Sequence, residues 1–291
     1  MKPIKTKLLS ETNVLPLTCS RTGTCCHGNQ VWINPWEVQQ LTKAKQISVS
    51  EFCKSTTDFG GIRLKFEGNP NLTGKKSCLL YDSSNGCSVH VERPLACRMY
   101  PLGRQIQHGE TQYIYQGEEF PCFKECPEVK ALPQLSVNEY LIGQNTKYYE
   151  IAQAGYLEVV QNLADNAFAL LLDTRLASSG DKNTLKTWRK LSTENPSTLF
   201  SNIKEEEWLN ALINPTVVYN EDPTIFIEQH NEYLQQKIQV CFGSLTTNQE
   251  FSDAAILLMN MALYLAISIG ANSKELAEHW IEVAKEHGAL E

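Results

Sequence analysis

Two adjacent cysteines, Cys25 and Cys26, follow a third one, Cys19, in the stretch TCSRTGTCCHG. Adjacent side chains of an extended segment point to opposite faces, so a single packed core rarely accommodates both sulfurs. A backbone loop removes this conflict, because it can turn both sulfurs toward one site. We therefore expect a loop at this pair, with at least one of the two sulfurs acting as a ligand.

The chain contains ten cysteines, and nine of them lie within the first 126 residues. No two have the C-x2-C spacing of a zinc ribbon or a thioredoxin-like redox site, so spacing alone names no metal. Thiolates suit zinc and iron–sulfur centres, which take about four ligands each. For Cys53 and Cys241 we expect packing as small hydrophobic side chains. The other eight are candidate metal ligands, enough for two all-cysteine sites or for one site with spares: Cys19, Cys25, Cys26, Cys78, Cys87, Cys97, Cys122 and Cys126.

A tight turn is predicted between Cys78 and Cys87 in the stretch SCLLYDSSNGCSVH. Asn85 and Gly86 form a dipeptide that strongly favours a two-residue turn. A turn at this place brings the two flanking sulfurs into the same neighbourhood.

The stretch VHVERPLACRMYPL (89–102) combines a cysteine with two arginines. Pro94 favours the first turn of a short helix, which would place Cys97 and Arg98 near Arg93. A site of four thiolates carries excess negative charge, and a neighbouring guanidinium offsets that charge and donates hydrogen bonds to sulfur. Arg93 and Arg98 are therefore candidate cofactor-binding residues. On spacing alone, two solvated arginines are the alternative interpretation.

Taken together, these motifs resemble the YkgJ-type cysteine-cluster family of zinc- or iron-chelating domains. The first block of that family, a cysteine followed by Gly-x-Cys-Cys, is similar to Cys19 and residues 23–26. Its last block, a cysteine ahead of a helix start, is similar to Cys126 before LSVNEYL. The resemblance covers about residues 15–142. Its middle block is similar to Cys78, Cys87, Arg93, Pro94, Cys97, Arg98, Tyr100 and Pro101.

This resemblance implies metal binding, with an iron–sulfur cluster or zinc as the cofactor. Zinc would be structural, whereas an iron–sulfur centre would allow electron transfer or redox sensing. One subgroup of the family is associated with flagellin lysine methylation, so a protein-lysine methylase is one alternative function. A scaffold whose helical half binds a protein partner is another. The sequence has no G-x-G-x-G loop after a strand and no recognisable catalytic set, so it leaves open whether the chain is an enzyme.

The composition bears on partners and location. The net charge is −7, from 26 Lys and Arg against 33 Asp and Glu, and no basic run is present, which argues against nucleic acid as a partner. The N-terminal segment lacks the apolar core of a secretory signal, so we expect a cytoplasmic protein, in which clustered thiols more often bind metal than form disulfides. The most apolar stretch, 254–270, contains Asn260 and is near the lower length limit of a membrane span. A buried core helix is the preferred interpretation, and no membrane partner is expected.

The pattern of predicted elements changes after Pro133. Before it, the chain shows short elements, including a helix that starts at Asn34-Pro35. After it, a capping box of Ser136 and Glu139 opens a helical pattern that continues to about residue 173. A half-buried strand pattern lies at 61–67, and the alternating stretch 104–116 resembles a hairpin that turns near Gly109. A loop is expected at 177–184, and further helices are expected at 203–213, 223–241, 251–269 and after Ser273. The sequence thus predicts an α+β fold, with a small cysteine-rich, metal-centred domain at 1–132 and an all-helical domain at 133–291.

Overall fold

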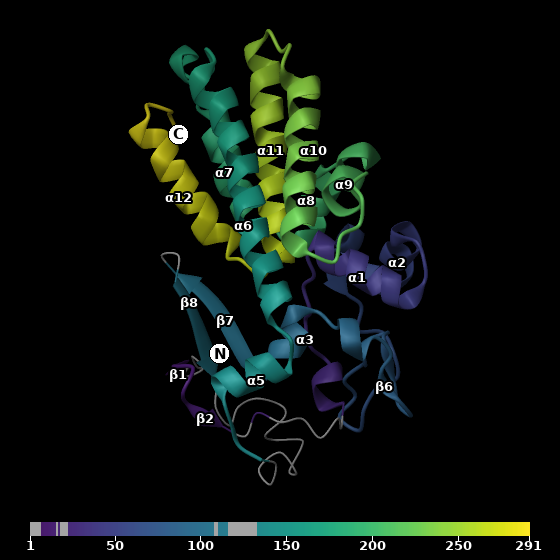
Figure 1. Ribbon diagram of the computed structural model, residues 1–291. Helices are drawn as coiled ribbons and strands as arrows, with labels where there is room; N and C mark the ends of the chain where they lie inside the picture. Colours follow the sequence, from purple (N-terminus) through teal and green to yellow (C-terminus); the bar gives the residue numbers. More distant parts are fainter. Residues whose placement is uncertain (1–6, 16, 18–22, 108–109, 116–132) are drawn as a thin grey trace. The chain divides into compact units, whose positions relative to one another are not determined.

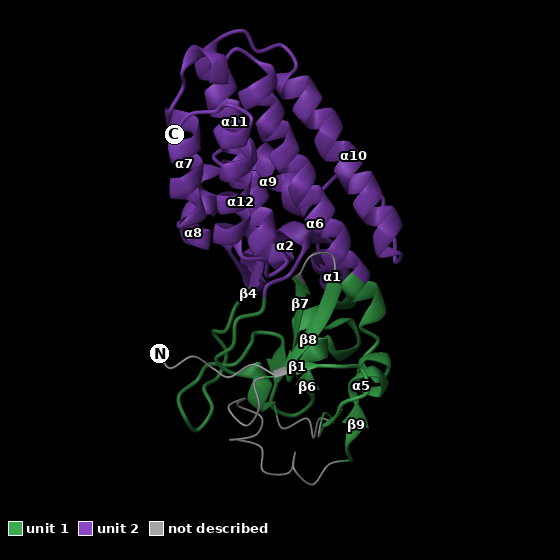
Figure 2. Ribbon diagram, turned by 90° about the vertical axis from the view of Figure 1, so that its left-hand side faces the viewer, with its two compact units in different colours: residues 1–31, 43–46, 64–150 green, residues 32–42, 47–63, 151–291 purple. Residues whose placement is uncertain are grey.

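The computed structural model describes residues 7–15, 17, 23–107, 110–115 and 133–291 and has the predicted α+β fold (Figure 1). Short strands in small sheets occur in the N-terminal part, and helices fill most of the C-terminal half. The chain divides into two compact units, which are coloured in Figure 2. Unit 1 consists of residues 1–31, 43–46 and 64–150, and unit 2 of residues 32–42, 47–63 and 151–291. The domain boundary at 132/133 stays a prediction, because these units divide the chain at other places.

Unit 1 contains an antiparallel sheet in the order β1 (Lys7–Leu9), β8 (Glu110–Tyr115) and β7 (Leu102–Gln107). Strands β7 and β8 form the hairpin that the alternating pattern at 104–116 predicted, and its turn lies outside the described residues. Gly103 faces Ile114 in this hairpin, where a Cβ atom on the glycine would lie 2.7 Å from Cγ1 of Ile114. The close pairing of the two strands therefore depends on glycine at this position.

The other strands are only two residues long. Two pairs lie in unit 1: β2 (Val14–Leu15) with β9 (Leu135–Ser136), and β5 (Tyr81–Asp82) with β6 (Gly86–Cys87). The strand predicted at 61–67 is reduced to β4 (Arg63–Leu64), which pairs with β3 (Thr57–Asp58). It ends there because the following residues bond to another segment: Leu79 N–H donates to the Lys65 carbonyl at 3.1 Å.

The helical pattern that begins at Ser136 is not one helix. Helix α5 (Val137–Gly143) starts with the predicted capping box of Ser136 and Glu139. It stops at Asn145, whose φ of 52° is left-handed, while Thr146 N–H donates to the Leu141 carbonyl at 3.3 Å. This is the Schellman arrangement that commonly ends a helix, and asparagine tolerates the left-handed position. The pattern resumes in α6 (Lys147–Phe168), which closes with a π-helical turn at Ala169–Asp173.

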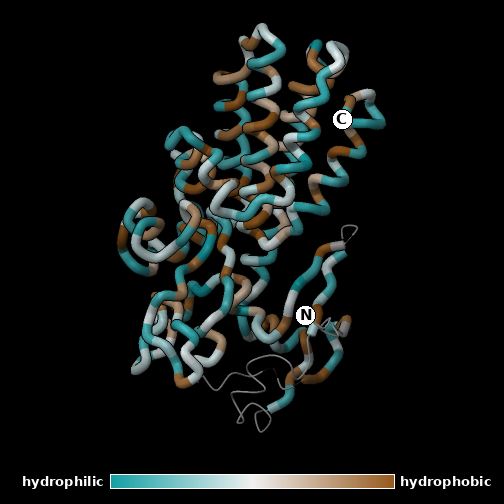
Figure 3. The backbone as a smooth tube through the Cα atoms, turned by 180° about the vertical axis from the view of Figure 1, so that it is seen from behind, coloured by the Kyte–Doolittle hydropathy of each residue, from teal (hydrophilic) through white to brown (hydrophobic). Residues whose placement is uncertain are grey.

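Most of the predicted helices of the C-terminal half are present within a few residues of their expected ends. Helix α7 (Asn183–Ser192) begins at the end of the stretch 177–184, where a loop was expected. Helix α8 (Pro196–Asn202) was not predicted, although Asn195 caps it in the usual way by accepting from Thr198 N–H at 3.0 Å. Hydrophobic and hydrophilic residues alternate along the turns of these helices (Figure 3). The other described helices are α1 (Pro35–Lys45), α2 (Val49–Thr56), α3 (Leu95–Met99), α9 (Glu206–Ile213), α10 (Pro223–Phe242), α11 (Asn248–Ser268) and α12 (Ser273–Glu286).

Helix α11 is the apolar centre of unit 2. Its length and composition would allow it to cross a membrane, but 72% of its most apolar stretch is buried in the protein. Leu258 and Tyr264 are fully buried, and Asn260 on the same helix donates to the Leu199 carbonyl at 2.9 Å. The side chain that weakened a membrane interpretation is therefore used inside the fold. This agrees with the predicted core helix.

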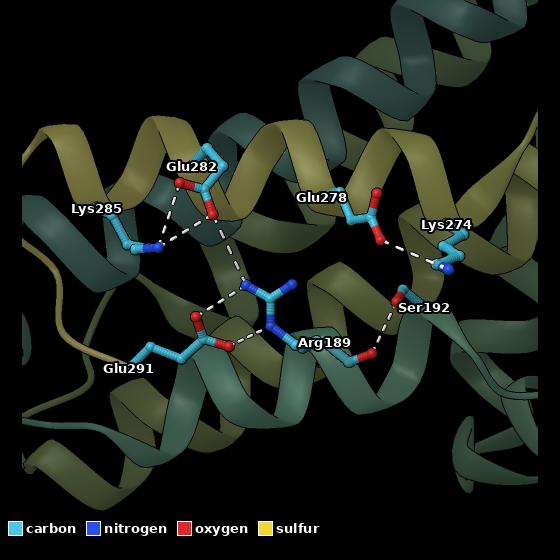
Figure 4. Close-up of polar contacts among 7 residues, drawn as sticks. All are labelled: Arg189, Ser192, Lys274, Glu278, Glu282, Lys285 and Glu291. Carbon is cyan, nitrogen blue, oxygen red and sulfur yellow. Dashed lines mark hydrogen bonds and ion pairs between the residues drawn. The ribbon is translucent and has the colours of Figure 1, made fainter.

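An exposed ion-pair cluster links α7 to α12 (Figure 4). Arg189 of α7 is bound in a fork by the carboxylate of Glu291, with Nη2 at 2.8 Å from Oε2, and lies 3.8 Å from Glu282 of α12. Lys285 approaches the same Glu282 at 3.0 Å. These side chains are largely solvated, so each pair contributes at most about 1 kcal/mol.

A buried histidine is the most unusual polar group of unit 2. His230 of α10 is fully buried, with Nδ1 at 2.9 Å from the Tyr156 hydroxyl and Nε2 at 2.8 Å from the Ala211 carbonyl. Because a carbonyl can only accept a hydrogen bond, Nε2 of His230 carries the proton and Nδ1 accepts from the Tyr156 hydroxyl. The ring of His230 is therefore a neutral imidazole. Burial disfavours the imidazolium and lowers the pKa of His230 to about 4, so this ring is neutral in the folded protein at neutral pH.

This neutral histidine predicts acid sensitivity of unit 2. Between the ordinary pKa near 6.5 and the folded value, the unfolded chain binds the proton and the folded chain does not, so stability falls as pH falls. We expect the loss between pH 7 and pH 5 to be about 2 kcal/mol. In His230→Gln, which can donate to Ala211 and accept from Tyr156 without titrating, that loss should disappear. All five tryptophans belong to unit 2. Urea unfolding followed by tryptophan fluorescence at each pH therefore measures the free energy of unfolding of this unit.

The matched control is His279→Gln on the exposed face of α12. It should keep the wild-type dependence on pH. An unchanged dependence in His230→Gln as well would show that other groups cause the acid sensitivity.

Candidate metal centre

The vicinal cysteines lie on a tight turn, as the sequence predicts. Residues Thr24–Cys26 form a 3-10 turn that follows Gly23, whose φ of 76° is left-handed. A Cβ atom at Gly23 would lie 2.5 Å from the Tyr81 hydroxyl, so both the backbone angle and the available space require glycine. Asn29 supports the turn from the other side, because its amide donates to the Cys25 carbonyl at 2.6 Å.

This turn is bound to the segment that carries Cys78. Cys78 N–H donates to the Cys26 carbonyl at 2.8 Å, and Gly28 N–H donates to the Lys76 carbonyl at 2.9 Å. His27 forms a bridge with Ser77 between them. Two cysteines separated by more than 50 residues in the sequence are therefore joined through their own main chains.

The next cysteine, Cys87, follows the predicted Asn85-Gly86 turn. Asp82 holds this turn by accepting from the N–H groups of Ser84 and Asn85, each at 2.8 Å. Strands β5 and β6 pair Tyr81 with Cys87. Burial, with a smaller contribution from the charge of Cys87, raises the pKa of the Cys78 thiol to about 11. The two sulfurs that flank the turn thus lie within electrostatic range, as predicted.

Arg93 lies beside Cys87 and Cys97. Helix α3 (Leu95–Met99) follows Pro94 and carries Cys97, as the sequence predicts. Burial raises the pKa of Cys87, and the positive charge of Arg93 acts in the opposite direction. The charges of Cys97 and Cys87 in turn favour the protonated form of Arg93, whose pKa is lowered mainly by burial. A cation is thus present at two of the candidate ligands.

The donor set suits a thiophilic metal. Four of the five described ligand candidates are related through neighbours: Cys26 to Cys78 by a backbone hydrogen bond, Cys78 to Cys87 by charge, and both Cys87 and Cys97 to the charge of Arg93. Within the part of the chain that the structure describes, no three side chains of His, Cys, Asp or Glu are arranged to hold a metal ion. The remaining candidates Cys19, Cys122 and Cys126 lie outside the described residues. The assignment of all eight ligands stays a prediction.

The two cysteines that were not taken as ligands belong to unit 2. Burial raises the pKa of Cys53 to about 11, and a Cβ atom on Gly61 would lie 3.0 Å from its sulfur, which agrees with a packed thiol. The expectation for Cys241 was wrong, because this side chain is exposed on α10. A single cysteine carries no pattern that distinguishes the buried face of a helix from its solvated face.

Arg98 has protein partners on every side. It is buried, with 4% of its surface exposed. Its Nε donates to the Arg93 carbonyl and its Nη1 to the Gln144 carbonyl, each at 2.8 Å. Its Nη2 donates to the Tyr149 hydroxyl at 2.8 Å and to the Val91 carbonyl. The guanidinium therefore ties residues 91–93 to the end of α5 and the start of α6, and a cofactor-binding role for Arg98 stays a prediction.

Two tyrosines complete this network, and sequence reasoning missed both. Tyr149 lies under Arg98, with the guanidinium carbon 3.9 Å from the ring centroid, and donates to Glu92 at 3.0 Å. Tyr140 of α5 donates to the carbonyls of Arg98 and Tyr100, at 3.2 and 2.5 Å. The helical pattern marks Tyr140 and Tyr148 as apolar positions, but Tyr148 is exposed and its neighbour Tyr149 is buried. Nothing in the pattern indicates that the hydroxyls of Tyr140 and Tyr149 bind the loop at 92–100.

The network predicts that lysine cannot replace Arg98. A lysine keeps the charge but cannot bond to acceptors in several directions at once, so Arg98→Lys should leave buried carbonyls unpaired and destabilise unit 1 by about 2–4 kcal/mol. Hydrogen exchange of the amides in α3 and α5 measures this loss. Arg189→Lys, in an exposed fork, should lose at most about 1 kcal/mol. Equal losses in the two variants would contradict the role assigned to the buried guanidinium.

Comparison with known proteins finds one matching family. Residues 18–120 match the family model CxxCxxCC, described as "Putative zinc- or iron-chelating domain". No curated protein and no solved structure matches the chain. Aligned on the vicinal pair, the pattern in the family's name falls on Cys19, Thr22, Cys25 and Cys26, so threonine replaces its second cysteine. The matched segment contains every described ligand candidate together with Arg93 and Arg98, so residues 18–120 of this chain are similar to the zinc- or iron-chelating, YkgJ-type domains.

Proposed function

We propose that this chain is a metal-binding protein whose N-terminal cysteines hold either zinc or an iron–sulfur cluster. The observation that carries the proposal is the run of neighbours from Cys26 through Cys78 to Cys87, together with the cation Arg93, whose charge interacts with both Cys87 and Cys97. Four cysteines from four separate stretches of chain belong to one unit. Packing alone gives no reason for such a gathering of thiols, whereas a thiophilic metal needs it.

The environment of these thiols supports the same proposal. A thiol must lose its proton to bind a metal, and burial opposes this loss at Cys78 and Cys87. Arg93 acts against that effect at Cys87. A bound metal ion would supply the positive charge that one guanidinium cannot supply for several thiolates. When bound, zinc would stabilise the fold, and an iron–sulfur cluster would accept and donate single electrons.

The location of the protein and its alternative functions are separate from metal binding. We propose a reducing compartment, the cytoplasm, because clustered free thiols persist there. Protein-lysine methylation and a scaffold role for unit 2 stay predictions, since no contact or cavity of the described residues favours either one.

Metal analysis of the protein tests the proposal directly. The full chain, purified without oxygen and without chelators, should contain about one metal centre per chain or more. Iron with acid-labile sulfide and broad visible absorption would identify a cluster, and colourless protein with stoichiometric zinc would identify a structural site. A protein that retains no zinc and no iron after this preparation, and takes up neither, would overturn the proposal.

Single substitutions distinguish ligands from other cysteines. Cys97→Ser and Cys78→Ser should each lower the metal content and the affinity for zinc by at least about tenfold, since removal of a ligand exceeds the usual effect of an outer partner. Cys241→Ser is the matched control, because this exposed thiol lies in unit 2 and its loss should change neither quantity. The measurement is competition for zinc with a coloured chelator. Full zinc affinity in both ligand variants would show that the site is built from other residues.

A further inference from the structure

Gln144 lies at the end of α5, beyond the matched segment, and its main chain is fixed independently of its side chain. It is the C-cap residue that follows Gly143 and precedes left-handed Asn145, and its N–H donates to the Tyr140 carbonyl at 2.9 Å and the Leu141 carbonyl at 3.2 Å. The helix end therefore needs only the backbone of this residue. The amide side chain is free to serve another purpose.

That side chain holds Arg93. The Gln144 Oε1 atom accepts a hydrogen bond from Arg93 Nη2, while the Gln144 carbonyl accepts from Arg98 Nη1 at 2.8 Å. Arg98 also contacts Arg93 directly, because its Nε donates to the Arg93 carbonyl at 2.8 Å. The C-cap residue of α5 thus contacts both Arg93 and Arg98, the first through its side chain and the second through its main chain.

The opposite side of the Arg93 guanidinium is held as well. Its Nη1 donates to the His90 carbonyl at 2.6 Å. With Nη1 bound to His90 and Nη2 bound to Gln144, the planar group has little freedom to rotate. Its charge acts on Cys87 and Cys97, so this orientation determines how the cation meets those two sulfurs.

The side chain of Gln144 carries no charge, which distinguishes it from a carboxylate partner of Arg93. Among the described residues no carboxylate pairs with Arg93, and the groups whose charges act on it are Arg98, Tyr140, Cys97 and Cys87. A glutamate at position 144 would hold the guanidinium equally well but would compensate its charge. An amide holds it and leaves the full positive charge for the thiolates.

We infer that Gln144 is a positioning residue of the metal centre, which fixes the Arg93 guanidinium beside Cys87 and Cys97 and thereby strengthens metal binding. This inference rests on the proposed metal-binding function. It assigns a role to a residue that lies outside the matched segment 18–120. The C-terminal end of α5 then contributes to the metal centre. Partners beyond the first ligand shell typically change metal affinity by about 10–100-fold.

Cobalt(II) is a suitable probe, because thiolate coordination gives it an absorption spectrum. The reduced, metal-free full chain is titrated with cobalt, and zinc is then used to displace it. Gln144→Met removes the acceptor at nearly constant volume and should weaken cobalt and zinc binding about tenfold. Gln144→Glu should weaken binding to a similar degree although it still holds Arg93, because its charge cancels that of the guanidinium.

A double-mutant cycle with Arg93→Met separates a positioning role from a structural one. If Gln144 acts through Arg93, then Gln144→Met has no further effect on metal affinity in the Arg93→Met background. The control is Gln161→Met in unit 2, which also removes an amide acceptor, here from Trp280 Nε1 at 3.1 Å. It should leave the cobalt spectrum and both affinities unchanged.

The outcomes are distinct. Wild-type affinity in both Gln144 variants would overturn the inference and leave the proposed function intact. An equal loss on Gln144→Met with and without Arg93 would also overturn it, since Gln144 would then act independently of the arginine. No thiolate–cobalt absorption in the wild-type protein would overturn the metal-binding function itself, and the inference with it.

Discussion

The guanidinium of Arg98 is buried in unit 1, and the shape of the cysteine motif depends on how its charge is accommodated. A buried cation is tolerated only when hydrogen-bond acceptors surround it. Here the acceptors come from three separate places: the carbonyls of residues 91 and 93, the carbonyl at the end of α5, and a hydroxyl of α6. None of these segments can move away without depriving the guanidinium of Arg98 of a hydrogen-bond acceptor. The constraint therefore fixes the loop that presents Cys87 and Cys97 without any contact between Arg98 and a sulfur being required.

Two arginines that look alike in the sequence thus have different surroundings. Arg98 is surrounded by neutral acceptors and a tyrosine ring, so its positive charge stabilises the backbone around it. Arg93 is held by two neutral acceptors while its charge acts on two cysteines. The separation follows from position on α3: Arg93 precedes the helix, next to Cys87, whereas Arg98 lies in its last turn on the buried side. Charge balance at a thiolate site and stability of the loop are therefore served by different side chains.

The features that were predictable from sequence are those governed by nearby residues. The turn at Asn85-Gly86, the helix after Pro94, the capping box at Ser136 and the need for a loop at Cys25-Cys26 all depend on a few consecutive side chains. The contacts that were missed join segments about 40–60 residues apart, as with Tyr149 and Glu92. The break between α5 and α6 was missed for a different reason. Hydrophobic periodicity continues across Asn145, and only its left-handed backbone shows that the helix ends there.

Unit 1 has little regular structure with which to stabilise itself. Its strands β2, β5, β6 and β9 are two residues long, and isolated hairpins of this kind are marginal in water. Much of its order comes from single hydrogen bonds between loops, such as the one from Cys78 to Cys26. The chain closes long loops at these points and loses the corresponding conformational entropy. Metal binding by the cysteines would offset that loss, because binding energy to a site that exists only in the folded state is also folding energy. The same cysteines would then define the fold as well as bind the metal, which explains why they lie where loops meet and why the helical unit, with its own apolar core around α11, needs none of them.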